Sequence, residues 1–120
     1  MEQKKIELED RLITFAAAIL TVSESLPRNL VADHVAEQLM RRGINPLYTY
    51  VEAQNAGSRN NFIEKMQLST NELKGTVNFL KVIKEKNWIS GDLSTLIDDN
   101  EHLIAIFAKS LSTARKNSIL

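Results

Sequence analysis

The chain of 120 residues contains no cysteine, only four glycines and only two prolines. The absence of cysteine excludes disulfides and thiolate metal sites. The longest apolar run, Phe15 to Leu20, is far shorter than the ~20 residues that cross a bilayer. The N-terminal stretch is charged and lacks the apolar core of a signal peptide. We therefore expect a single cytoplasmic domain over residues 1–120 that does not enter a membrane.

Neither sign of charge predominates, because fifteen lysines and arginines face fifteen aspartates and glutamates, and the formal net charge is zero. General binding to polyanions rests on a basic footprint. The composition therefore disfavours a general nucleic-acid binder but leaves room for a local basic patch. A neutral surface also gives little repulsion between copies, which permits self-association.

Hydrophobic residues recur at spacings of three and four along four segments. In the first segment this stripe consists of Leu8, Leu12, Phe15, Ile19, Val22 and Leu26. With so few glycines and prolines, the periodicity predicts amphipathic helices, which we place at residues 6–26, 30–56, 61–86 and 93–116. Short connections force neighbouring helices to run antiparallel. The expected fold is all-α, an antiparallel up-down-up-down four-helix bundle.

The second helix carries an interruption near its middle. Its expected core positions are Val31, Val35, Leu39, Leu47 and Val51. Pro46 lies between Leu39 and Leu47. A proline cannot donate a backbone hydrogen bond, and its ring clashes with the carbonyl of residue 42, so we expect a kink or a short break. Gly43 beside it permits close approach of a neighbouring element.

Polar residues before three of the helices are candidate N-caps. Asn29, Asn61 and Asp92 have side chains that can accept from an otherwise unpaired N–H of the first turn. Glu64 follows Asn61 by three, as in a capping box. Trp88 is expected to close one end of the bundle, and the last four residues are expected to fray.

No pattern of catalytic or cofactor-binding residues stands out, and we expect a protein that is not an enzyme and needs no cofactor. The sequence has no glycine-flanked serine elbow, phosphate loop or dinucleotide fingerprint. His34 and His102 do not follow a glutamate by three, as the di-iron sites of helical bundles require. We interpret both histidines as solvated or locally bonded, and we predict no metal site.

Basic residues cluster at two places. Lys74, Lys81 and Lys84 fall on one face of the third helix, and Arg41 and Arg42 lie at the expected kink of the second. These five residues are our candidates for contact with RNA or DNA phosphates, provided that they converge on one surface. The alternative is an ordinary solvated face.

Several apolar residues lie off the main stripes by simple heptad counting. Ile63, Phe79 and Ile106 are the candidates for an interface between subunits, together with Ile13. Broad stripes also arise when each helix of a bundle packs on two neighbours. We favour the interface, and with it a homo-oligomer.

Two stretches resemble a known family. They are Val35–Gln54, which contains Arg41-Arg42-Gly43 and Tyr50-Val-Glu-Ala, and Asn61–Leu80, which contains Asn61-Phe-Ile-Glu-Lys and Asn71-Glu-Leu-Lys-Gly-Thr. They are similar to the bacterial four-helix bundles encoded by intervening sequences in 23S ribosomal RNA genes, and to the related accessory variability proteins of diversity-generating retroelements. The resemblance extends over roughly residues 8–116.

The resemblance implies a bundle that assembles as a homopentamer and, for the retroelement relatives, binding to nucleic acid and to a reverse transcriptase. Positions that match the family pattern are expected to serve packing and assembly; they are Arg41, Arg42, Tyr50, Glu52, Phe62, Lys65, Glu72 and Leu80. Two positions depart from the pattern. Gly75 stands where the family has a second glutamate, and Phe79 where it has tryptophan. A glycine inside a helix costs about 1 kcal/mol relative to alanine, so we expect a close backbone contact at Gly75.

Overall fold

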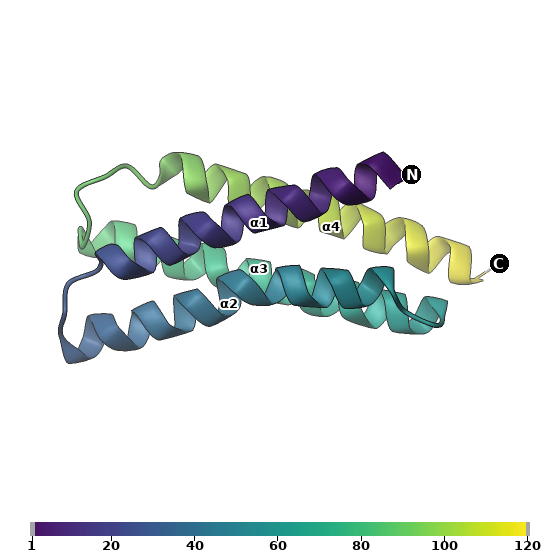
Figure 1. Ribbon diagram of the computed structural model, residues 1–120, viewed down its shortest axis with the longest axis horizontal. Helices are drawn as coiled ribbons and strands as arrows, with labels where there is room; N and C mark the ends of the chain where they lie inside the picture. Colours follow the sequence, from purple (N-terminus) through teal and green to yellow (C-terminus); the bar gives the residue numbers. More distant parts are fainter. Residues whose placement is uncertain (1, 120) are drawn as a thin grey trace.

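Four long antiparallel helices make up the computed structural model, which describes residues 2–119 and the side chains of residues 7–117. The helices are α1 (Glu2–Ser25), α2 (Leu30–Gln54), α3 (Arg59–Lys86) and α4 (Ser94–Ile119). They alternate in direction and form an elongated molecule of 51 × 25 × 20 Å (Figure 1). The predicted all-α fold is therefore confirmed.

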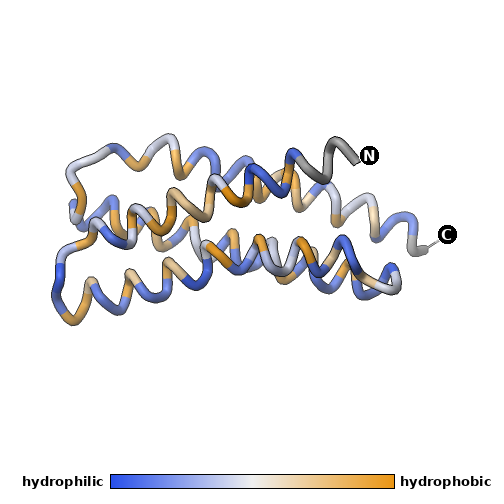
Figure 2. Tube along the Cα trace, viewed as in Figure 1, coloured by the Kyte–Doolittle hydropathy of each residue, from blue (hydrophilic) through white to orange (hydrophobic). Residues whose placement is uncertain are grey.

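One hydrophobic core runs along the bundle, and Figure 2 shows apolar residues recurring on all four helices. The predicted stripe of α1 is confirmed from Leu12 to Leu26, and α3 buries its stripe from Met66 to Ile83. Val77, which lies beside that stripe, is buried as well. The reason is that α3 packs on both α2 and α4, so its apolar face is broad.

The helices pack unequally around this core. Extensive contacts join α1 to α2, α2 to α3 and α3 to α4, whereas α1 and α4 contact each other much less. Figure 1 shows α1 and α4 crossing, so that they diverge on either side of the crossing point. A hollow between them is lined by Phe15 and Ala18 of α1 and by Leu96 and Leu103 of α4.

The second helix is continuous from Leu30 to Gln54, and the short break considered at Pro46 is absent. The bend is present, because the axis of α2 changes direction near its middle (Figure 1). Pro46 is buried, so packing on both sides holds the helix together despite the missing hydrogen bond.

The core face of α2 differs from the predicted one. Its buried residues are Ala32, Leu39, Gly43, Pro46, Tyr50 and Ala53. Val31 and Val51 were predicted to be core but are 63% and 36% exposed. Leu39 is buried as predicted, and Val35 and Leu47 are partly buried against the core. The prediction was wrong at Val31 and Val51 because it followed large apolar residues, whereas the buried face of α2 is formed mainly by small ones.

Polar side chains cap the starts of the helices, and one of the caps differs from the predicted residue. Asn29 caps α2 as predicted, with its side chain accepting from the N–H of Ala32. The cap of α3 is Ser58, which accepts from the N–H of Asn61, so the capping box at Asn61 was wrong by three residues. The Asp92 carboxylate accepts from the N–H of Ser94, which holds its pKa below the usual value. At the far end, α4 continues through Ile119 instead of fraying after Lys116.

Candidate interaction surfaces

Large apolar side chains are exposed on the outer side of α1 and α2. Met40, Ile44, Leu47 and Val51 follow one another on α2 at spacings of four, three and four, which places them on one side of the helix. Tyr48 adjoins them and is 66% exposed; Ile13 of α1 is 49% exposed, and Leu20 lies two turns further along the same side. Leu20 and Met40 line a shared hollow, so the two rows are adjacent. We name this surface the α1–α2 apolar strip; its members are Ile13, Leu20, Met40, Ile44, Leu47, Tyr48 and Val51.

The strip exists because α2 is apolar on two sides. Its inner side is narrow at Gly43, where Ile19 of α1 packs so closely that an added Cβ would lie 2.5 Å from the Ile19 Cγ2 atom. Small inner residues such as Gly43 let α2 lie close to α1, while Met40, Tyr48 and Val51 of the same helix remain exposed. Sequence reasoning missed Met40 and Tyr48. The signal was available, because one helix with two apolar stripes has more apolar residues than one core face accepts.

Of the four predicted interface residues, Ile13 belongs to this strip, and the other three occupy other places. Ile63 and Phe79 are partly buried and pack against the core, so less of their surface is free than predicted. The Phe79 ring also lies below the Arg42 guanidinium, with 6.0 Å between the carbon at its centre and the ring centroid. Ile106 lines a groove between α3 and α4.

Arg42 is held in the seam between α2 and α3. Its Nη1 donates to a Glu72 carboxylate oxygen at 3.3 Å, and the Asn45 amide donates to the other oxygen at 2.8 Å. Gly75 makes room for this side chain, since a Cβ there would lie 2.5 Å from the Arg42 Nη1 atom. The close backbone contact expected at Gly75 is absent, and an arginine side chain occupies the space instead. The two departures from the family pattern, Gly75 and Phe79, both adjoin Arg42.

The five basic candidates do not converge on one surface. Arg41 and Arg42 pair with Glu37 and Glu72, while Lys84 reaches Ser94 of α4 at 3.4 Å. Lys74 and Lys81 are exposed. Lys74 and Lys81 come two residues after Glu72 and Phe79, the α3 side chains that contact Arg42. Two residues correspond to a rotation of roughly 200° around the helix axis, so both lysines point away from α2. The arginines and the lysines therefore face different sides of the bundle.

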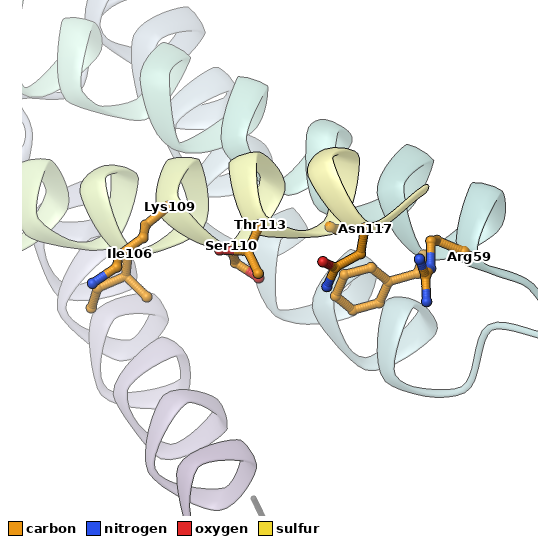
Figure 3. Close-up of a pocket in the computed structure, with 8 residues that line it drawn as sticks. Arg59, Ile106, Lys109, Ser110, Thr113 and Asn117 are labelled. Atoms are coloured by element: carbon orange, nitrogen blue, oxygen red, sulfur yellow. The ribbon is translucent and has the colours of Figure 1, made fainter. Parts of the chain in front are cut away.

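A groove of 840 Å³ lies between the first turn of α3 and the C-terminal half of α4. Its lining residues are Arg59, Phe62, Ile106, Lys109, Ser110, Thr113, Ala114 and Asn117. Figure 3 shows Lys109 beside Ile106 at one end of the groove and Arg59 near Asn117 at the other. Within the described residues, neither Arg59 nor Lys109 has an ion pair or a side-chain hydrogen bond.

Asn100 is the buried polar residue that interrupts the apolar face of α4. Its side chain is fully buried, and its amide nitrogen donates to the Leu73 carbonyl of α3 at 3.0 Å. The Oδ1 atom has no partner among the described residues. This bond fixes the register between α3 and α4 at one point in the core.

Residues 2–119 offer neither a cluster of metal ligands nor a membrane span. His34 and His102 are both exposed, and no group of three or more possible ligands occurs in the described part of the chain. No helix there is long and apolar enough to cross a membrane.

Comparison with known proteins supports the architecture. No family model matches the sequence, and no curated protein matches it. The fold is similar to the crystal structure of a protein with unknown function from the S23 ribosomal protein family of Bacteroides thetaiotaomicron, at a TM-score of 0.78 and 20% sequence identity. The match covers 91% of this chain and 98% of that chain. At this identity the likeness shows the four-helix fold alone, and the relation to retroelement proteins stays a prediction.

Proposed function

We propose that the chain is a non-enzymatic interaction module that assembles with copies of itself through the α1–α2 apolar strip. The observation that carries this proposal is the exposure of neighbouring large apolar residues on two adjacent helices, with Tyr48 66% and Ile13 49% exposed. Single exposed apolar residues are ordinary, but contiguous ones are typical of interfaces.

Energetics and charge support the same role. Covering a fully exposed valine, isoleucine or methionine side chain contributes about 1.5–3 kcal/mol. The strip contains several such side chains, each of them partly covered already, so their joint burial can still offset part of the entropy that association costs. Because the net charge is zero, the electrostatic repulsion between copies is weak.

The symmetry of the assembly decides which surfaces meet. In a two-fold dimer the strip would face itself, whereas in a ring it would face a different surface of the next copy. The pentamer implied by the family resemblance is a ring. Ile63 and Phe79 on α3, which keep part of their apolar surface exposed, are the predicted counterpart in that case.

Light scattering over a dilution series tests the proposal. We expect wild-type protein at micromolar concentration to have a mass above that of one chain. The double variant Tyr48→Lys/Val51→Lys should shift the mass towards one chain, because two charges would have to be buried in the interface. Leu30→Lys/Val31→Lys is the matched control, since these two residues are 87% and 63% exposed at the start of α2, outside the strip. A wild-type monomer at all concentrations, or a double variant of unchanged mass, would contradict the proposal.

A further inference from the structure

We infer that the groove between α3 and α4 is a docking site for an acidic amphipathic helix of a partner protein. This site lies outside the α1–α2 apolar strip and does not depend on self-association. Its supporting features are the shape of the groove, the apolar character of its floor and the placement of two cations.

The shape suits a helix. The groove follows α4 from Ile106 to Asn117, about 17 Å along a helix that rises 1.5 Å per residue. It is open to solvent, as a surface groove must be to admit a helix that remains part of a larger protein. Amphipathic helices bind such grooves with apolar residues at spacings of three and four.

The floor is apolar where the occupant would lie deepest. Ile106, Phe62 and Ala114 supply it, and each is only partly buried in the isolated chain. A nucleic acid would place phosphates and sugars against these side chains. An apolar floor therefore favours a protein partner over RNA or DNA.

The two cations supply the charge selectivity. Lys109 and Arg59 lie at opposite ends of the groove (Figure 3), and none of the eight described residues that line it is acidic. Arg59 lies near Asn117, which follows Lys109 by eight residues, so the two cations are about 12 Å apart along α4. Two acidic residues placed about two turns apart on a bound helix would have the same separation. The first turn of α3 contains no acidic residue, so the positive end of that helix adds to the attraction.

Binding of a synthetic peptide tests the inference directly. The probe is a fluorescent helical peptide with two glutamates two turns apart and leucines between them, and its control is the same peptide with lysines in place of the glutamates. We expect saturable binding of the acidic peptide in an anisotropy titration, and much weaker binding of the basic one. Absence of saturable binding, or equal binding of the two peptides, would overturn the inference.

Charge reversal in the protein locates the site. Arg59→Glu/Lys109→Glu should weaken binding of the acidic peptide about tenfold, because two weak attractive pairs become repulsive, and should strengthen binding of the basic peptide. The matched control is Lys74→Glu/Lys81→Glu, which changes the net charge equally at exposed sites outside the groove. Circular dichroism confirms that each variant is folded.

Three further results would also overturn the inference. In the first, the groove variant and the control variant weaken peptide binding equally, which would indicate a general charge effect. In the second, the groove variant lowers the mass of the self-assembled protein in light scattering, which would assign the groove to a second copy of this chain. In the third, a single-stranded oligonucleotide displaces the peptide from wild-type protein but not from the groove variant.

Discussion

At the scale of single residues, Gly43 sets how closely α1 approaches α2. The Ile19 side chain occupies the space where a Cβ would stand, with its Cγ2, Cβ and Cγ1 atoms within 2.9 Å of that position. The Ile19 Cβ is attached directly to the backbone of α1, so it can move only if the helix moves. At Gly75 the conflict is with the far end of Arg42, which is flexible. Two helical glycines therefore differ in what a side chain would disturb.

We expect Gly43→Ala to lower the free energy of unfolding by about 1–3 kcal/mol, the usual cost of overpacking a core. The gain in helix propensity, about 1 kcal/mol, is the smaller of the two effects. Chemical denaturation measures the change. Gly57→Ala is the control, since nothing lies within 4 Å of an added Cβ there and Gly57 has no positive φ. A Gly43→Ala variant as stable as the control would show that α1 can shift outward without loss.

The same scale shows what a sequence can and cannot predict. The stripe of α1 was readable because large apolar residues form it without interruption, and Asn29 was readable because a cap needs only local chemistry. The inner face of α2 was not, since Gly43 and Pro46 have no hydrophobic signature and their burial depends on Ile19 and on neighbouring helices. The ion pair between Arg42 and Glu72 could not be predicted either, because the two residues are 30 positions apart in the sequence.

At the scale of whole elements, the start of α3 gives a clean comparison between two neighbouring candidates. The sequence pattern favoured Asn61 as the cap, yet the chain already turns into the helix at Arg59, after Ser58 in an extended conformation. The Ser58 hydroxyl accepts from the N–H of Asn61 at 3.1 Å. Asn61 itself stands inside the first turn, where its side chain has no capping role.

We therefore predict that Ser58→Ala lowers the free energy of unfolding by about 1 kcal/mol, the typical cost of losing an N-cap. Asn61→Ala, an exposed substitution in the same turn, should stay within about 0.5 kcal/mol of wild type. Thermal or urea unfolding of both variants gives the comparison. Equal losses for the two variants would place the cap at neither residue, and a larger loss at Asn61 would restore the original interpretation.

The two proposed surfaces also belong to the scale of elements, because each depends on a pair of helices. The α1–α2 apolar strip needs the close packing at Gly43, which fixes the two rows side by side. The groove needs α4 to diverge from α1 beyond their crossing, so that Ile106 and Ala114 stay uncovered. Interface candidates could be named from the apolar pattern, but the depth at which each helix is buried determines which residues remain exposed.

At the scale of the whole molecule, the bundle is unevenly closed. The central helices α2 and α3 each pack closely on two neighbours, whereas α1 packs closely on α2 and touches α4 mainly where they cross. Local opening follows the density of buried contacts. The α1–α4 side is therefore where the molecule should open most easily, starting from the ends at which the two helices diverge.

Hydrogen exchange checks this expectation and at the same time bears on assembly. At low protein concentration, mid-helix amides of α1 should exchange about tenfold faster than those of α3, after correction for intrinsic rates, because a difference of 1.4 kcal/mol in opening free energy gives that ratio. If copies then associate through the α1–α2 apolar strip as a two-fold dimer, raising the concentration should slow exchange in α1 and α2 while leaving α3 unchanged, whereas in a ring the counterpart surface on α3 should be slowed as well. Uniform protection of all four helices would show that the weak α1–α4 contact does not limit stability. Slowing confined to α3 and α4 would instead place self-association on the other side of the bundle.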